Sequence, residues 1–329
     1  MPGADAGLRH SLTWLVLILA SLLALALAVA IGSETVQPMQ VFAVLRGEGE
    51  PLHRLLLLEL RAPRALAAFA TGGLLAVAGA LMQVLLRNPL ADPYVLGLSG
   101  GAAVGALAAM LSGLGTALIS GSAFAGALLS TLLVFGLAHG TGSWTPTRLL
   151  LTGVVVAAGW GAVITLMLAL SPAERLPGML YWLMGDMSYA RSPWPPVLTL
   201  VLACLLLLPA GRVLNVLARG PLQAAALGVA VRPLEWGIYI LASLLTAVAV
   251  TTAGSVGFVG LVVPHMLRLV LGNDQRIILP AAALAGGILL TLADTLARTV
   301  LAPEQLPVGV ITALLGVPTF LYLLYRSRM

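Results

Sequence analysis

The sequence contains no lysine and little charge of either sign. All 17 basic residues are arginine, 12 residues are acidic, and charged residues make up 9% of the chain, against about 25% in an ordinary soluble domain. Hydrophobic residues make up 60%. A chain of this composition cannot cover a folded core with a polar surface, so we expect it to lie in a membrane.

The missing residue types also exclude several kinds of site. The phosphate-binding loop of ATPases ends in Gly-Lys-Ser/Thr, so a chain without lysine must rely on a separate polypeptide for any ATP hydrolysis. The single cysteine, Cys204, can form no internal disulfide, and no cluster of Cys or His has metal-ligand spacing. An enzyme would need a converging set of nucleophile, acid and base, and the sequence offers no such set. We therefore expect no catalytic residue, no metal and no cofactor in this chain.

Long runs without Asp, Glu, Arg or Lys are abundant. They are Ser11–Ser33, Ala65–Leu86, Pro93–Thr147, Leu149–Ala173, Ser192–Gly211, Trp236–Leu267, Ile277–Ala293 and Gln305–Tyr325. A bilayer core needs about 20 apolar residues per helix, and backbone groups in lipid must be paired within a helix or a closed barrel. The runs are continuous rather than alternating, which indicates helices.

Breaks at Gly, Pro and charge clusters divide these runs into about ten predicted spans. They lie near 11–32, 64–86, 93–111, 117–138, 148–170, 194–210, 236–253, 256–271, 278–299 and 307–325. The fold class predicted is therefore an all-α integral membrane protein, with residues 1–329 as one transmembrane domain. A break within 236–271 is expected near Gly254, Gly257 and Gly260.

The orientation follows from the arginines. With the N-terminus inside, more than half of them fall in inner loops, which favours cytoplasmic N- and C-termini in a bacterial inner membrane. Residues 33–63 and 171–193 would then be periplasmic, and 211–235 cytoplasmic. The first run contains Ala28-Val29-Ala30, similar to a signal-peptidase site, but its length and the membranous remainder favour an uncleaved span.

One loop carries a specific motif. Arg87-Asn88-Pro89-Leu90-Ala91-Asp92-Pro93 contains two prolines that prevent a continuous helix, and Asn88 and Asp92 can cap helix starts. The motif is followed by Gly97-Leu98-Ser99-Gly100-Gly101. This pattern resembles the FecCD-type permeases, over about Arg61 to Tyr325. Further matches are Arg61-Ala62-Pro63-Arg64, Thr147-Arg148-Leu149-Leu150-Leu151, Gly257-Phe258-Val259-Gly260-Leu261-Val262-Val263-Pro264-His265, Ala293-Asp294 and Leu306-Pro307-Val308-Gly309.

The resemblance implies a type II ABC importer for a metal chelate: vitamin B12, a ferric siderophore or haem. In that family two copies of a ten-helix subunit form a central pathway. Two ATPase subunits bind inside and a substrate-binding protein docks outside; membrane lipid surrounds the complex, and nucleic acid is not a partner. The alternative is an ion-coupled secondary transporter of a bulky solute, which is disfavoured because the mid-span positions lack ionisable residues.

The resemblance also implies three groups of site residues. A short cytoplasmic helix, starting at Pro221 and ending at Gly228, would couple to the ATPase through Arg219, Gly220, Pro221, Ala225, Leu227 and Gly228. The family's acidic residue after the first glycine is replaced here by Pro221, so an acid-mediated contact is not expected. An ordinary interfacial helix is the alternative.

The other two groups lie at opposite membrane faces. Arg61, Arg64 and Arg298 match positions where the family presents arginines to carboxylates of the binding protein. Asp294 precedes Arg298 by one turn, so an intrahelical ion pair is the competing interpretation. Candidate cytoplasmic gate residues are Asn88, Leu90 and Thr147, with plain loop turns as the alternative.

Overall fold

The computed structural model describes residues 2–32, 36–139, 145–190 and 192–326. Within these ranges the chain consists of helices and loops, and seven helices are long and apolar enough to cross a membrane. The long helices are α1 (Pro2–Ala30), α4 (Ala62–Leu85), α6 (Thr116–His139), α7 (Pro146–Ala169), α9 (Trp194–Ala218), α11 (Val231–Ala253) and α13 (Gln275–Thr299). The shorter apolar helices are α5 (Leu98–Leu111), α12 (Val259–Leu271) and α14 (Val308–Arg326).

The remaining elements are short. They are α2 (Pro38–Leu45), α3 (Pro51–Arg54), the π-helix η1 (Leu55–Arg61), the 3-10 helices η2 (Pro93–Leu96) and η3 (Met187–Tyr189), α8 (Leu176–Met184) and α10 (Pro221–Ala226). The prediction of an all-α membrane fold is confirmed, and each predicted span coincides with one of the ten long or shorter apolar helices.

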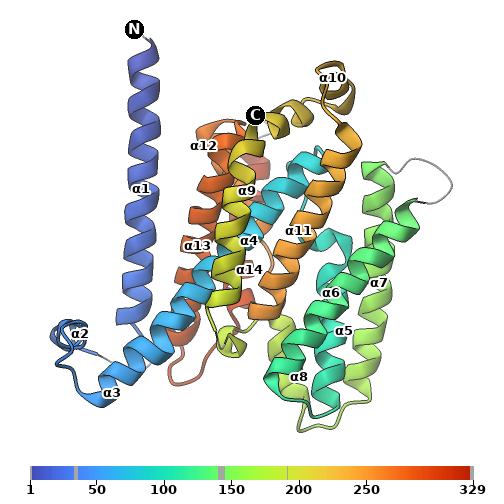
Figure 1. Cartoon of the computed structure of the whole chain (residues 1–329). Coiled ribbons are helices and arrows are strands. Elements are labelled where there is room, and N and C mark those ends of the chain that lie inside the picture. Colours follow the sequence, from blue (N-terminus) through green and yellow to red (C-terminus); the bar gives the residue numbers. More distant parts are fainter. Residues whose placement is uncertain (1, 33–35, 140–144, 191, 327–329) are drawn as a thin grey trace.

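Helix α4 lies at the centre of the bundle, with α9, α11, α12 and α13 packed around it (Figure 1). Nearly all of its side chains are buried. A Cβ atom built on Gly72 would overlap the carbonyl oxygen of Gly286 on α13, and one built on Gly79 would overlap that of Gly260 on α12. Small residues at these positions therefore allow the backbones to touch, which is how membrane helices gain close packing.

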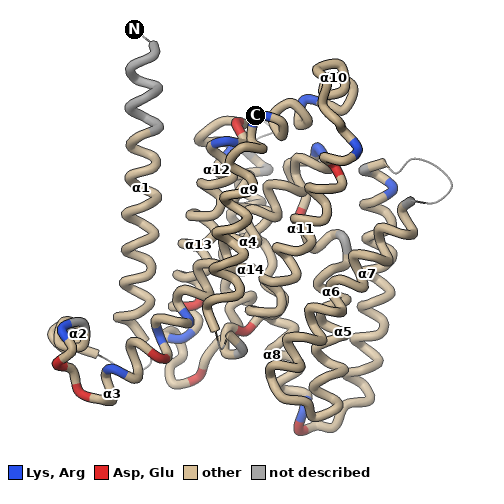
Figure 2. Tube along the Cα trace, viewed as in Figure 1, with Lys and Arg blue, Asp and Glu red and all other residues tan. Residues whose placement is uncertain are grey.

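Taken in chain order, the ten long and shorter apolar helices alternate in direction, so that the bundle has two distinct ends (Figure 1). The first described turn of α1, the short helix α10 and the last turns of α14 lie together at one end, called here the α10 end. The helices α2, α3 and α8 lie at the other, called the α8 end. Charged residues gather at these ends and leave the middle nearly free of charge (Figure 2), as a bilayer core requires.

Several helices differ in length from the prediction. Helix α1 starts at Pro2 rather than 11, and α5 starts at Leu98 rather than 93, after the separate 3-10 helix η2. Helix α9 continues past 210 to Ala218, and α11 starts at Val231 rather than 236. The prediction ended each span where charge begins, but Arg212 and Arg232 are exposed at the helix ends, where long side chains reach water. The predicted polar stretch 211–235 is thus mostly the ends of two helices, joined by α10 and its flanking turns.

Candidate functional site

The loop that carries the motif, Arg87–Pro93, begins at an unusual C-terminal end of α4. Arg87 has a positive φ of 49°, and its N–H donates to Val84 O while the N–H of Asn88 donates to Gln83 O at 3.2 Å. These are the bonds of a Schellman cap, whose left-handed position normally holds glycine. Asn88 then accepts a hydrogen bond from the N–H of Leu90 at 2.9 Å. The loop leaves Asn88 and Leu90 exposed at the α10 end.

Beyond the loop the chain turns back into the bundle. Asp92 accepts a hydrogen bond from the N–H of Tyr94 at 2.8 Å and so caps η2. A Cβ built on Gly260 would lie 2.8 Å from Pro93 Cδ and 2.9 Å from the carbonyl oxygen of Leu75, which is near the middle of α4. Helix α5 therefore starts inside the bundle rather than at its surface.

Helix α12 starts at a similar depth. Gly254, with a φ of 65°, ends α11, and Phe258, with a φ of 70°, precedes α12. The hydroxyl groups of Ser99 and Ser255 lie 2.7 Å apart, and Tyr94 OH accepts a hydrogen bond from the N–H of Val256 at 3.3 Å. The predicted break within 236–271 is confirmed. The pairing of these two half-length helices is a feature that sequence reasoning did not find.

Helix α7 is tied to the same region by a polar chain. Trp160 Nε1 donates to Ser130 Oγ at 2.9 Å, and Ser130 Oγ donates to the carbonyl oxygen of Gly97 at 2.8 Å. At the N-terminus of α7, Thr145 caps the helix, and Thr147 is exposed in the first turn. Thr147 thus lies at the same α10 end as Asn88 and Leu90, on a different helix.

The short helix α10 has the expected shape. Pro221 stands in its first turn, Gly220 has a φ of 129°, and Gly228 has a φ of 80° just after its end. Ala224 is buried against the bundle, whereas Leu222 and Leu227 are 86% and 70% exposed. Ala225 and Arg219 are exposed as well. An apolar surface projects from the bundle at this end, where solvent alone would favour polar side chains.

The outer arginines form a network at the α8 end. Arg64 donates through Nε and Nη2 to the carboxylate of Asp294, with a shortest N–O distance of 2.8 Å, and through Nη1 to Gln305 Oε1 at 2.9 Å. Arg298 Nε donates to the same carboxylate at 3.1 Å. Asp294 is 1% exposed. The intrahelical ion pair considered for Arg298 is therefore present.

Two of these arginines also secure the end of α1. Arg61 donates to the carbonyl oxygens of Val29 and Ala30, and Arg298 donates to that of Ala28. The last carbonyl groups of a helix lack intrahelical partners and attract cations. Arg61 and Arg298 are both 6% exposed. All three arginines line an open cavity of about 490 Å³, and Arg64 is the most accessible of them.

Residues 16–326 match the FecCD transport family, which is almost the whole of the described bundle. The chain belongs to this family. Proteins similar to the chain include an ABC transporter permease protein and the permease proteins of a hemin transport system and a vitamin B12 import system, so the chain is a multi-pass membrane permease.

Three relatives illustrate the range of the family. The chain is 39% identical to the vitamin B12 import system permease protein BtuC of Escherichia coli O9:H4, over 97% of each chain. It is 40% identical to the hemin transport system permease protein HmuU of Yersinia pestis, over 82% of this chain and 83% of HmuU. It is 39% identical to the uncharacterized ABC transporter permease protein YvrB of Bacillus subtilis, over 86% of this chain and 82% of YvrB.

Two solved structures share the fold. A metal-chelate type ABC transporter in an inward-facing conformation superposes with a TM-score of 0.84 and 29% identity, over 95% of this chain and 98% of that one. PsaBC from Streptococcus pneumoniae, solved with a Fab, superposes with a TM-score of 0.56 and 17% identity, over 86% and 94% of the two chains. The second similarity concerns the fold alone.

Proposed function

We propose that this chain is the membrane-spanning permease subunit of a binding-protein-dependent ABC importer that carries a metal chelate into the cytoplasm. The superposition on a metal-chelate type ABC transporter over 95% of the chain, at a TM-score of 0.84, is the observation that carries this proposal. The relatives named for vitamin B12 and for hemin support the same class of cargo. Ferric siderophore, cobalamin and haem are the candidate substrates.

The chemistry of the chain suits such a cargo. The middle of the bundle is nearly free of charged residues (Figure 2), and several of its helix contacts are made at glycines, so few fixed charges would hold a solute in place. A large rigid chelate passes such walls without strong hydrogen bonds, so selectivity resides mostly in the binding protein. Two separate ATPase subunits supply the energy for alternating access, because this chain contains no lysine for a phosphate-binding loop.

A second copy of the chain completes the pathway. Of the long described helices, α7 has the smallest share of buried side chains. A Cβ atom built on Gly159 or on Gly161 of α7 would meet no atom of this chain. Small residues on an open helix face allow another helix to approach closely. The homodimer therefore places α7 beside its counterpart.

The gate lies at the α10 end, which faces the cytoplasm together with both termini. Asn88, Leu90 and Thr147 are exposed there on two different segments. A bulky apolar side chain between small polar ones can close against its symmetry mate and part again when the subunits move. The half-length helices α5 and α12, which meet at Ser99 and Ser255, give the bundle a break that can transmit this motion.

Coupling to the ATPase uses α10 and its flanks, Arg219, Gly220, Pro221, Ala225, Leu227 and Gly228. The exposed Leu222 and Leu227 are apolar groups suited to a cleft in the partner. A helix this short is held by its buried Ala224 and by the two positive-φ glycines, so that it moves with α9 and α11. ATP-driven closure can therefore be passed to the spans.

The binding protein docks at the α8 end, on the periplasmic side. Arg64 borders the open cavity there and contacts a carboxylate of the partner, which suits a guanidinium group. Arg61 and Arg298 are buried, and their contribution to docking is to hold the end of α1 and the carboxylate of Asp294 in place. Of the three predicted docking residues, Arg64 thus contacts the binding protein, and Arg61 and Arg298 hold the neighbouring groups in place.

A reconstituted transport assay tests the proposal. Vesicles would contain the chain with its partner ATPase and binding protein, and radiolabelled cobalamin, a ferric siderophore and haem would be offered in parallel. ATP-dependent accumulation of one of them is expected. An ATPase whose phosphate-binding lysine is replaced by alanine serves as the control and should give no uptake. Uptake that ignores ATP and follows an ion gradient would establish the secondary-transporter alternative instead.

A further inference from the structure

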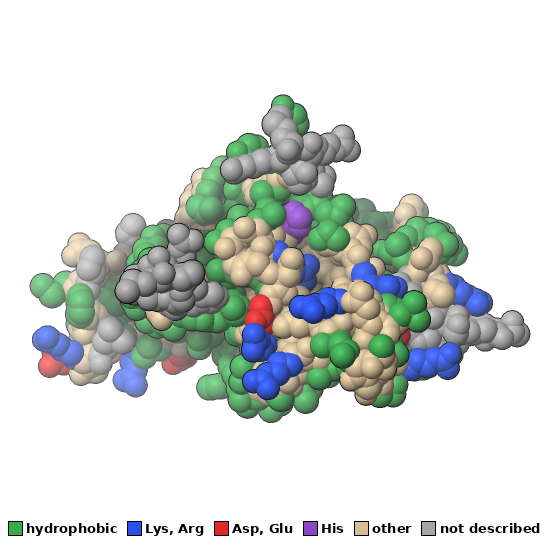
Figure 3. Space-filling model, turned by 90° about the horizontal axis from the view of Figure 1, so that it is seen from above, with side chains coloured by type: hydrophobic (Ala, Val, Ile, Leu, Met, Phe, Trp, Pro, Cys, Tyr) green, Lys and Arg blue, Asp and Glu red, His purple; other side chains and the backbone are tan. Residues whose placement is uncertain are grey.

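The α10 end contains an open pocket of about 710 Å³. It lies between the last turns of α4, α9 and α12 and the first turn of α13, and reaches the residue that joins α9 to α10. Its charged lining consists of Arg87, Arg219, Arg268, Arg276 and Asp274. Arginine side chains gather on this face of the molecule, with an acidic group beside them (Figure 3).

The pocket carries a surplus of positive charge. Asp274 pairs with Arg276, with a shortest N–O distance of 2.5 Å. The bonds from Arg276 hold the pKa of Asp274 below its usual range, so this acid stays ionised and neutralises one arginine. Among the described residues, the other three arginines have no carboxylate within ion-pair distance. Glu235 of α11 acts on Arg87 from beyond that distance.

Arg87 stands at a backbone position that suits glycine. Its φ of 49° lies in the left-handed region, which is unfavourable for a residue with a side chain. Glycine would form the same helix cap without steric cost. An arginine kept in this conformation at the edge of a basic pocket indicates that the pocket requires its charge.

The surroundings of the pocket indicate what covers it. Arg219 lines the pocket and also belongs to the flank of α10 that couples to the ATPase in the proposed function. The sequence from Gly211 to Leu234 contains no Asp or Glu. This stretch therefore offers a bound ATPase apolar and positive groups, and a subunit seated on α10 reaches the basic pocket beside it. Complementary charge at such an interface requires acidic side chains on the partner.

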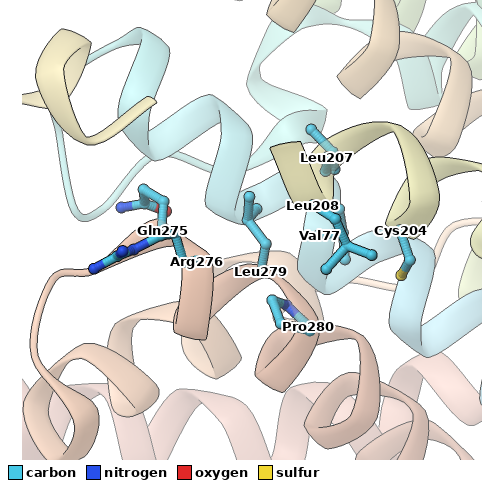
Figure 4. Close-up of a pocket in the computed structure, with 8 residues that line it drawn as sticks. All are labelled: Val77, Cys204, Leu207, Leu208, Gln275, Arg276, Leu279 and Pro280. Carbon is cyan, nitrogen blue, oxygen red and sulfur yellow. The ribbon is translucent and has the colours of Figure 1, made fainter. Parts of the chain in front are cut away.

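The pocket gives no passage towards the bilayer between α9 and α13. The crevice there runs over Val77 of α4 and is lined by Cys204, Leu207, Leu208, Leu279 and Pro280 (Figure 4). Its volume is about 10 Å³, which holds one water molecule at most. A lipid acyl chain cannot enter it, so the occupant of the pocket comes from the α10 end.

We propose that this pocket receives an acidic side chain of the ATPase subunit while α10 occupies the cleft of the same subunit. Guanidinium groups suit this partner because they bind a carboxylate through two parallel hydrogen bonds. Helix α10 is joined to α9 and α11, whereas Arg87 ends α4 and Arg276 begins α13. The acid thus gives the ATPase a second attachment, to the central helix and to the turn between α12 and α13. This inference rests on the proposed function, in which the ATPase binds at the α10 end.

Binding of the partner ATPase to the purified full-length chain in lipid nanodiscs tests the proposal. R87G/R276Q removes two pocket charges and should weaken binding about tenfold or more, as expected when one side of a charged interfacial contact is lost. The control R148Q/R212Q removes the same charge from exposed arginines of this end that do not line the pocket. It should bind as the native chain does.

The single variant R87G separates charge from folding. Its unfolding temperature should stay the same or rise, because glycine adopts a positive φ without steric cost, whereas its binding of the ATPase should weaken. R87K keeps the charge and should bind better than R87G. A purely structural role for Arg87 predicts the opposite, a change in unfolding without a change in binding. If R87G/R276Q does not fold, R87G alone decides the question.

Salt dependence and crosslinking identify the partner group. Raising the salt concentration to about 0.5 M should weaken binding of the native chain more than that of R87G/R276Q, because salt screens ion pairs. p-Benzoylphenylalanine in place of Asn273, an exposed residue of the pocket, should crosslink to the ATPase next to an Asp or Glu. An ATPase with that acid replaced by its amide should bind the native chain as weakly as the native ATPase binds R87G/R276Q, and combining the changes should add little.

The possible failures are distinguishable. Unchanged binding in R87G/R276Q, with the native chain bound, would overturn the pocket proposal and leave coupling through α10 intact. Equal losses in the pocket and control variants would show general charge attraction only. Competition by inorganic phosphate without a crosslink would indicate a site for a free anion, and a crosslink to a second copy of the chain would indicate a subunit contact. If the native chain does not bind the ATPase at all, the proposed function itself is contradicted.

Discussion

Arg64 on α4 and Asp294 on α13 form an ion pair with an N–O distance of 2.8 Å, although 230 residues separate them in the sequence. The carboxylate of Asp294 also binds Arg298, whose guanidinium group reaches the end of α1. One buried acid therefore joins three helices at the α8 end of the bundle. Removing it would leave two neighbouring cations without a counter-charge.

The variant D294N tests the importance of this acid for stability. We expect its free energy of unfolding to fall by about 3 kcal/mol, because breaking a buried ion pair leaves an uncompensated charge. Thermal unfolding in detergent, followed by tryptophan fluorescence, measures the change. Glu304, an exposed acid near the end of α13, provides the control E304Q, which should unfold as the native chain does. Equal unfolding temperatures for D294N and the native chain would contradict the structural role.

The contact between α4 and α13 predicts the effect of a single methyl group. G72A should be destabilised by about 1–3 kcal/mol, because its Cβ would overlap the carbonyl oxygen of Gly286. Gly237 on α11 is the matched control, since a Cβ there meets open space. G237A should unfold at the same or a slightly higher temperature. If G72A behaves like G237A, the helices do not approach at this point.

The exposed leucines of α10 predict a defect that is separate from folding. L222A/L227A should weaken association with the ATPase at least about tenfold, because the two leucine side chains would no longer bury their apolar area against the ATPase. Its unfolding temperature should stay unchanged because both side chains are exposed. L301A, an exposed leucine at the α8 end, is the control. Normal association in the double variant would exclude α10 as the coupling element.

The outer arginines predict two different phenotypes. R64Q should weaken docking of the binding protein about tenfold, as expected when one partner of a charged interfacial pair is removed. It should also lower the unfolding temperature, because Arg64 is an ion-pair partner of the buried Asp294. R61Q should mainly lower the unfolding temperature, because Arg61 bonds the carbonyl oxygens of Val29 and Ala30. Surface plasmon resonance with the binding protein measures the first effect and calorimetry the second. Unaltered docking of R64Q would remove Arg64 from the interface.

Local patterns were sufficient for much of the fold. Uncharged runs mark the spans because a charge within the bilayer is costly, and Pro221 and Gly228 mark the short helix because each imposes its own backbone geometry. The helix ends near Arg212 and Arg232 were placed wrongly, since an arginine at a helix end can reach water while its backbone remains helical.

The sequence by itself determined that this chain spans a membrane as a set of helices, because hydropathy depends on residues close together in the chain. Only the tertiary structure decided which groups the arginines meet. Arg61 and Arg298 look equally available in the sequence, yet both are buried against the end of α1, and Arg64 is bound to Asp294. The meeting of α5 and α12 at Ser99 and Ser255 was likewise decided by packing. Such contacts depend on how distant helices pack, which no local pattern encodes.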